Sequence, residues 1–145
     1  MNKIDSFKGQ YSFLSNFHPC EILHENIIYK SSEALYQAMK TDDPEEKRKI
    51  AILETPGMAK RAGRNLKNIR QDWRVRRIIC MERTLVLKFK DPQLRKKLLE
   101  TGSAELIEGN TWGDKYWGVC DGIGENHLGK LLMKIRSKIK NRELL

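Results

Sequence analysis

The sequence predicts a single helix-dominated domain of the α+β class that spans residues 1–145. Several helix starts carry a capping residue followed by proline, and two long segments repeat apolar residues at helical spacing. The β-like pieces are short and few. A chain of 145 residues can bury one hydrophobic core, and no linker, internal repeat or low-complexity segment divides it.

The first thirty residues are aromatic and irregular. We expect short β-like pieces around residues 12–14 and 21–29. Helices should dominate after that point, and the first of them should begin near Ser32 as its cap. Two further short strands are expected at residues 105–108 and 116–119.

Three more helix starts are indicated by a cap followed by proline. Asp43, Thr55 and Asp91 each precede a proline, which is tolerated at the first helical position. Gly63 suits the left-handed position that follows a helix end.

Two long helices follow from apolar periodicity. The first should run from about residue 71 to residue 89. The second is C-terminal, with an apolar stripe on one side and lysines mostly on the other. Its stripe consists of Leu128, Leu131, Leu132, Ile135 and Ile139.

The net charge of +9, from 28 basic and 19 acidic residues, favours anionic partners such as phosphates or nucleic acid. No apolar run approaches the ~18 residues of a membrane span, and the N-terminus lacks a signal-peptide core. We therefore expect a cytoplasmic protein with no membrane partner. Cys20, Cys80 and Cys120 form no paired motif, so we expect apolar fillers rather than a disulfide framework or a zinc site.

The helix near Ser32 places Glu33, Tyr36, Gln37 and Lys40 on one face. On periodicity alone, this pattern favours an amphipathic helix with a solvated polar face. The mixture of an acid, a base, an amide and a phenol, directly after an aromatic segment, also fits a functional site.

Trp73 stands at the start of the long helix and is more typical of a core residue there. Its functional alternative is a surface on which a base stacks, worth about 1–3 kcal/mol per base. Residues 112–130 combine two tryptophans, two aspartates and five glycines before a helix. That segment fits a structured loop and a ligand-binding loop equally well. The run from Gly124 to Lys130 matches G-x-x-x-x-G-K, but Leu131 replaces the Ser or Thr that a nucleoside-triphosphate loop needs.

Motifs in a fixed order cover nearly the whole chain and resemble the NADAR, or YbiA-like, family. They lie at residues 13–17, 32–40, 59–64, 72–73, 98–102, 114–118 and 124–136. The resemblance implies a fold of helices around a small β element. It also implies N-glycosidase chemistry on ribose-linked compounds, among them phosphorylated intermediates of riboflavin biosynthesis and ADP-ribose attached to a nucleobase.

By this resemblance, Glu33, Trp73 and Asp114 take active-site positions. The expected pocket-lining residues are Asn16, Phe17, Lys40, Trp117, Gly118 and Asn126, to which we add Tyr36 on the polar helix face. Lys40 and the basic segment 60–64, which includes Arg64, should hold phosphate. The chain departs from the family pattern at Ala34, where His is common, and at Ser103, where Asp is common.

The implied partner is a small nucleotide-like substrate, with ADP-ribosylated nucleic acid as a further candidate, and no metal or redox cofactor is needed. Either Glu33 or Asp114 would activate water while the other stabilises the ribosyl cation. The alternative is a non-catalytic module that binds nucleotide, ADP-ribose or nucleic acid. That module would bind polynucleotide with strong salt dependence and would be indifferent to Glu33.

Overall fold

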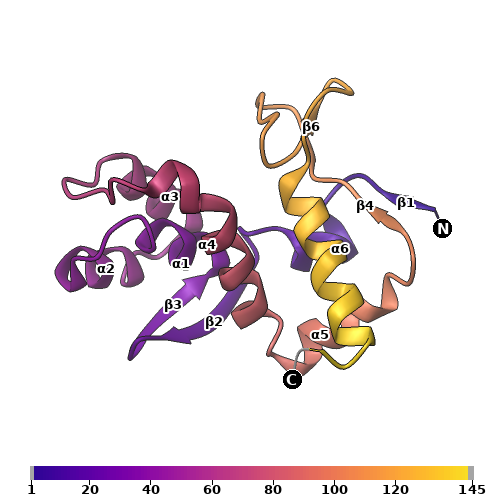
Figure 1. Cartoon of the computed structure of the whole chain (residues 1–145), viewed down its shortest axis with the longest axis horizontal. Coiled ribbons are helices and arrows are strands. Elements are labelled where there is room, and N and C mark those ends of the chain that lie inside the picture. Colours follow the sequence, from indigo (N-terminus) through magenta and orange to yellow (C-terminus); the bar gives the residue numbers. More distant parts are fainter. Residues whose placement is uncertain (1, 144–145) are drawn as a thin grey trace. The chain divides into compact units, whose positions relative to one another are not determined.

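Helices carry most of the regular structure in the computed structural model, which describes residues 2–143 (Figure 1). The helices are η1 (Gly9–Leu14, a 3₁₀-helix), α1 (Ser32–Ala38), α2 (Pro44–Ala51), α3 (Pro56–Arg64), α4 (Trp73–Lys88), α5 (Pro92–Glu100) and α6 (His127–Lys140). The strands are β1 (Lys3–Ile4), β2 (Pro19–His24), β3 (Ile27–Ser31), β4 (Glu105–Leu106), β5 (Gly109–Asn110) and β6 (Val119–Cys120). The predicted helix-dominated α+β class is confirmed.

Residue contacts divide the described chain into two units. We call residues 16–88 the hairpin unit, and residues 2–15 together with 89–143 the terminal unit. None of the helices in the described part of the chain has both the length and the apolar character needed to cross a membrane.

The hairpin unit is built on the antiparallel pair β2–β3, with Ile22 opposite Tyr29. Glu25 and Asn26 connect the strands with φ values of 51° and 64°, the left-handed backbone that tight hairpin turns require. Helix α1 packs against β3, α2, α3 and α4, so all of its residues are buried. The core around it comprises Ile22, Tyr29, Ala34, Leu35, Ala38, Ile50, Ala51 and Ala59.

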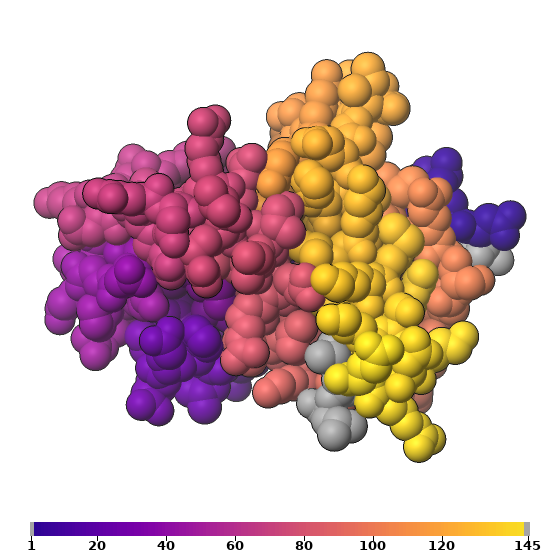
Figure 2. All heavy atoms as spheres, in the orientation of Figure 1, coloured from indigo at the N-terminus to yellow at the C-terminus, as the bar shows by residue number. Residues whose placement is uncertain are grey.

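The terminal unit pairs β1 in parallel with β4, which joins the start of the chain to a segment a hundred residues later. Helix α6 packs against β4 and α5. Its predicted apolar stripe is buried. The segment that carries β5 and β6, also paired in parallel, lies at the N-terminal end of α6 and reaches the surface (Figures 1 and 2).

The predicted caps of α2, α3 and α5 are confirmed. The Asp43 side chain accepts a hydrogen bond from Glu45 N–H, Thr55 accepts one from Met58 N–H, and Asp91 accepts two from the first turn of α5. Each bond satisfies an amide that has no partner within its own helix.

Three local predictions were wrong. Residues 12–14 belong to η1 rather than to a strand, because the chain closes a 3₁₀ turn in which Ser15 N–H donates to the Ser12 carbonyl. Gly63 lies inside α3 rather than beyond its end. The cap of α1 is Ser31, whose hydroxyl accepts from Ala34 N–H, and Ser32 is the first helical residue.

Other boundaries moved by a few residues. Helix α4 begins at Trp73 because residues 70–72 form a turn in which Trp73 N–H donates to the Arg70 carbonyl. The strand expected at 105–108 is confirmed only for Glu105–Leu106. The strand expected at 116–119 is shifted to Val119–Cys120.

Candidate active site

The first turn of α1 is held by Asn16, which stands three residues before the start of β2. Asn16 is buried, and its carbonyl accepts a hydrogen bond from Glu33 N–H at 3.0 Å. The Ser32 hydroxyl donates to the Asn16 side-chain oxygen at 2.9 Å. The Asn16 amide nitrogen in turn lies 3.4 Å from the Met81 sulfur. Asn16, predicted as a pocket residue, therefore positions the helix that carries Glu33.

Glu33 is buried, with 8% of its surface exposed. The side-chain nitrogen of Gln37, one turn later, donates to Glu33 Oε2 at 2.5 Å. A carboxylate that accepts such a bond is held in one orientation. The polar face of α1 is thus buried rather than solvated, contrary to what periodicity favoured.

Gln37 also lies against α3, at Gly63. A Cβ atom at Gly63 would overlap the Gln37 side-chain oxygen, so glycine is needed there for the close approach of α3 to α1. Gln37 was recognised on the polar face but not as a partner of Glu33.

Tyr36 and Trp73 form a ring pair next to this carboxylate-bearing face, with centroids 5.3 Å apart and planes tilted by 53°. Arg70 N–H donates to the Lys40 carbonyl at 2.8 Å, which ties the start of α4 to the end of α1. Lys40 Nζ lies 6.0 Å from both ring centroids, within the range of a cation–π interaction.

Lys40 links these rings to further charged groups. The pKa of Lys40 is lowered, chiefly by burial. The charges of Arg64 and Lys60 lower this pKa further, whereas the charge of Glu33 opposes the shift. The Lys60 ammonium also lies 6.0 Å from the ring of Phe17, which is 45% exposed. The hairpin unit therefore gathers a buried acid, aromatic rings and a cluster of cations, which can hold a phosphate and stabilise a cationic centre.

Ala34, where the chain departs from the family pattern, is buried in the core of the hairpin unit. Its methyl group therefore serves packing here.

The remaining predicted residues belong to the terminal unit. Asp114 Oδ1 accepts hydrogen bonds from Tyr116 N–H at 3.1 Å and Trp117 N–H at 2.9 Å. The Asn110 side chain makes two hydrogen bonds to the backbone of Asp114. Its oxygen accepts one from Asp114 N–H, and its nitrogen donates one to the Asp114 carbonyl. Asn110 was not predicted, and its position four residues before Asp114 was the only local signal.

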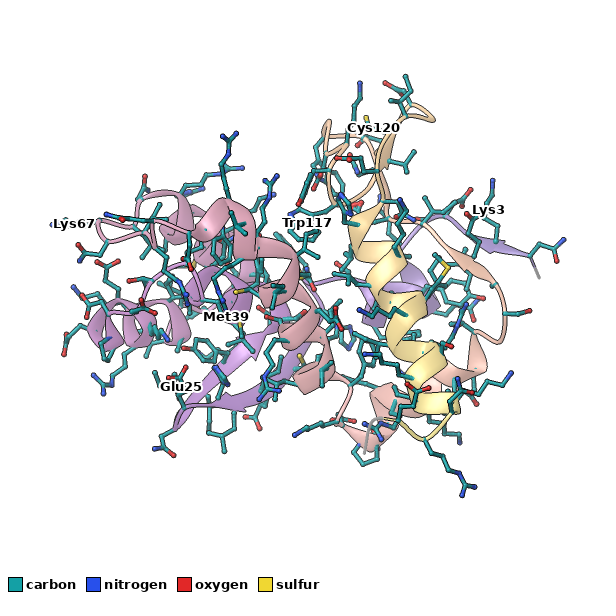
Figure 3. All side chains as sticks on the ribbon, viewed as in Figure 1. Lys3, Glu25, Met39, Lys67, Trp117 and Cys120 are labelled. Carbon is teal, nitrogen blue, oxygen red and sulfur yellow. The ribbon has the colours of Figure 1, made fainter. Side chains whose placement is uncertain are left out.

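Trp117, which is labelled in Figure 3, forms a ring cluster with Tyr116 and His127 at the start of α6. The Tyr116 ring lies 4.9 Å from Trp117 and 4.5 Å from His127, measured between centroids. Gly118 is required because a Cβ there would overlap the Glu108 carbonyl.

Asn126 is the N-cap of α6 and adopts a left-handed backbone with φ of 55°. Its side-chain oxygen accepts from Glu108 N–H and its nitrogen donates to the Leu106 carbonyl, both at 2.9 Å. Both ends of this amide are therefore engaged with the backbone of the segment around β4.

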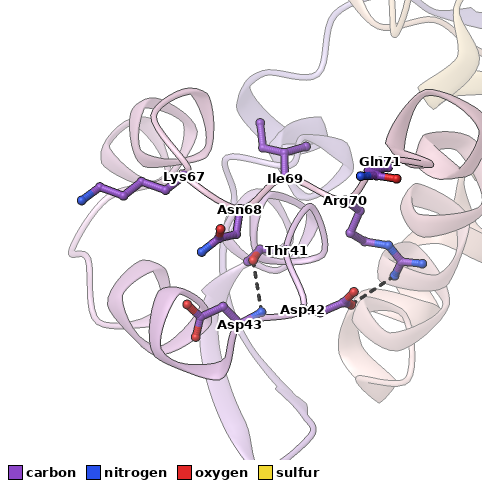
Figure 4. Close-up of a pocket in the computed structure, with 8 residues that line it drawn as sticks. All are labelled: Thr41, Asp42, Asp43, Lys67, Asn68, Ile69, Arg70 and Gln71. Carbon is purple, nitrogen blue, oxygen red and sulfur yellow. Dashed lines mark hydrogen bonds and ion pairs between the residues drawn. The ribbon is translucent and has the colours of Figure 1, made fainter.

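Two surface hollows in the hairpin unit lie outside the predicted site, and neither is lined by Glu33 or Trp73. The larger has a volume of about 420 Å³ (Figure 4). It is lined by Thr41, Asp42, Asp43, Lys67, Asn68, Ile69, Arg70 and Gln71. Within residues 2–143, no cluster of three or more His, Cys, Asp or Glu side chains is arranged to hold a metal ion.

Comparison with known proteins places this architecture in a family. Residues 5–140 match the family model described as the NADAR domain. The chain is 34% identical over 137 residues to N-glycosidase YbiA of Escherichia coli, a match that covers 92% of this chain and 85% of that protein. It is 36% identical over 133 residues to a riboflavin biosynthesis protein of Vibrio vulnificus, covering 90% of this chain but only 36% of that longer protein.

The fold is similar as well. The NMR structure of YbiA from Escherichia coli superimposes with a TM-score of 0.84 at 32% sequence identity, covering 99% of this chain and 89% of that one. The match extends over both units and almost all elements described above. The chain therefore belongs to the NADAR domain family.

Proposed function

We propose that this protein is an N-glycosidase that hydrolyses the C1′–N bond of a ribose-phosphate or ADP-ribose-type substrate. The observation that carries the proposal is the buried carboxylate of Glu33, fixed by Gln37 and accompanied by the Tyr36–Trp73 rings. Relatives named N-glycosidase and riboflavin biosynthesis protein support this class of reaction.

Hydrolysis of the C1′–N bond is assisted by a negative charge near the ribose. As the C1′–N bond breaks, its electron pair leaves with the base nitrogen and positive charge develops on the ribose ring. A carboxylate stabilises that charge or accepts a proton from the attacking water, whose oxygen bonds to C1′. The departing nitrogen takes up a proton. The comparison with two-acid glycoside hydrolysis is by analogy, and we propose Glu33 and Asp114 as the two acids without ordering their roles.

The other side chains would bind the substrate. Trp73 would stack on the leaving base, and Lys40, Lys60 and Arg64 would hold phosphate. Phosphate oxygens suit these groups because charge-assisted hydrogen bonds are stronger than neutral ones.

Base release from a ribosylaminopyrimidine phosphate, and from ADP-ribosylated guanine nucleotides, tests the proposal by chromatography. Glu33→Gln and Asp114→Asn should each lower kcat by at least about 100-fold, the scale of a lost general base or electrostatic stabiliser. Glu21→Gln is the matched control, because Glu21 is exposed on β2 and should leave the rate unchanged. Full activity in both Glu33→Gln and Asp114→Asn, with unchanged circular dichroism, would refute the mechanism.

The phosphate role has its own signature. Lys60→Gln should raise KM by about 10-fold or more with a smaller effect on kcat, because a charge-assisted bond contributes about 1.5–3 kcal/mol. With a substrate analogue that lacks the phosphate, Lys60→Gln and the parent protein should have the same KM.

The net charge of +9 favours one alternative, a module that binds polynucleotide without catalysis. That module would lose affinity steeply with salt and would be insensitive to Glu33→Gln. Polynucleotide binding of this kind without base release from either substrate class would favour the alternative.

A further inference from the structure

A second hollow of the hairpin unit has the character of an anion site. Its volume is about 360 Å³, within the size range of small-ligand pockets. We call it the basic hollow. Its lining comes from the β2–β3 turn, α2, the segments after α1 and before α4, and α4 itself. It consists of His24, Glu25, Met39, Asp42, Lys47, Arg70, Arg76, Ile79, Cys80 and Arg83.

Four permanent cations in this lining face two carboxylates. Lys47 is paired with Glu25 at 3.3 Å, and Arg70 with Asp42 at 3.5 Å (Figure 4). Arg70 is further satisfied by Asp72, with two hydrogen bonds of 3.1 and 3.2 Å. Two of the cations are therefore compensated within the protein.

Arg76 and Arg83 supply the excess positive charge. The nearest acid to Arg76 is Asp72, with Nε 3.8 Å from Oδ2, beyond hydrogen-bond distance. Arg76 Nε is buried and makes no hydrogen bond to any residue in the described chain. Arg83 is exposed and has no ion-pair partner within residues 2–143. The Arg76 side chain keeps 42% of its surface exposed, so the rest of its guanidinium group can meet a ligand in the hollow.

His24 reports the electrostatic field of the hollow. Burial lowers its pKa below 6.5, and Lys47 and Arg83 lower it further, whereas Glu25 opposes them. The imidazole nitrogen Nε2 lies 3.1 Å from Glu25 Oε1. The positive charges of Lys47 and Arg83 therefore act on the imidazole ring of His24. An anion bound beside these cations should change the pKa of that ring.

Part of the lining is apolar, from Met39, Ile79 and Cys80. Ile79 is 56% exposed, which leaves a hydrophobic surface beside the arginines. Such a wall suits a carbon group attached to the anion.

We propose that the basic hollow binds a phosphomonoester dianion between the guanidinium groups of Arg76 and Arg83, at a site separate from the residues around Glu33. Planar guanidinium groups match phosphate oxygens with paired N–H donors. The site would be filled by a small phosphorylated molecule, whose oxygens would accept hydrogen bonds from the terminal guanidinium nitrogens of Arg76 and Arg83. None of its lining residues is among those proposed to cleave the substrate or bind it.

The test is an NMR titration of the histidine ring resonances with inorganic phosphate and with ribose 5-phosphate, at ionic strength held constant with chloride. The His24 resonance should shift saturably and its pKa should rise, because a nearby dianion favours the protonated ring. Arg76→Gln and Arg83→Gln should each weaken the response by about tenfold, the effect of one lost charge-assisted bond. Arg74→Gln, exposed on the same helix but outside the hollow, should change it by no more than about twofold.

Four outcomes would overturn the proposal. The first is a His24 response that does not saturate, and the second is one that Arg74→Gln weakens as much as Arg83→Gln does. The third is tighter binding of a short oligonucleotide than of ribose 5-phosphate at the same residues, which would identify a nucleic-acid surface. Lys60→Gln, a change in the proposed substrate site, should leave the His24 response intact. Loss of that response would show that the two sites are one.

Discussion

Replacing Asn126 by alanine tests whether this side chain holds the start of α6. The substitution removes two hydrogen bonds of 2.9 Å, to Glu108 N–H and to the Leu106 carbonyl. A buried polar group left unsatisfied costs about 1–3 kcal/mol. Alanine at φ of 55° adds about 1 kcal/mol, since asparagine tolerates the left-handed region better than alanine does. We therefore expect a loss of about 2–4 kcal/mol in the free energy of unfolding.

Urea unfolding, followed by both far-UV circular dichroism and tryptophan fluorescence, measures this loss. Asn126→Gly separates the two contributions, because it removes the same bonds but accepts the backbone, and should lose about 1 kcal/mol less than alanine. Asn141→Ala is the matched control. Its side chain makes one exposed bond of 3.5 Å at the other end of α6 and should change stability by less than about 0.5 kcal/mol.

A loss below about 1 kcal/mol for Asn126→Ala would refute the reasoning, since one unsatisfied buried group alone should exceed it. The amide would then be available to a ligand, as the family resemblance implies.

Three further predictions concern buried groups. Gly63→Ala should lose about 1–3 kcal/mol of unfolding free energy by overpacking against Gln37, and a second change, Gln37→Ala, should reduce that loss in a double-mutant cycle. Burial lowers the pKa of Lys88 from 10.5 to about 8, so the unfolded chain binds more protons between these values and stability should rise with pH across that interval, by at most about 3 kcal/mol. The free energy of unfolding of Lys88→Met, measured in urea at pH 7, 8 and 9.5, should not show this rise. The same pH dependence in Lys88→Met and in the parent protein would contradict the prediction. Arg136→Met should lose about 1.5–3 kcal/mol or more, because its guanidinium donates to Thr101 Oγ1 and the Ala104 carbonyl at 2.8 Å, whereas a neutral result would mean that these bonds do not stabilise the terminal unit.

Helix positions were predictable because they depend on neighbours in the chain. A cap such as Asp43 or Asp91 bonds an amide two or three residues later, so its effect can be inferred from the residues alone. The apolar stripe of α6 depends only on helical periodicity, and it is buried as expected. The motif order likewise identified the family without any structure.

The environment of Glu33 was not predictable in this way. Its spacing from Tyr36 and Lys40 placed it on a polar helix face, and such a face is more often solvated. It is buried because α1 is surrounded by β3 and three helices, which the local pattern of α1 does not contain. The aromatic pair of Tyr36 with Trp73 likewise joins residues 37 positions apart.

The sequence by itself thus determined where the helices lie, which faces are apolar and which family the chain resembles, because these depend on short-range hydrogen bonding and periodicity. Only the tertiary structure decided what the candidate residues do. It placed Gln37 against Glu33 through the close approach at Gly63, and it engaged both ends of the Asn126 amide with backbone 18 and 20 residues earlier in the chain. Those contacts arise from packing between distant segments, and packing of that kind leaves no signal in local sequence.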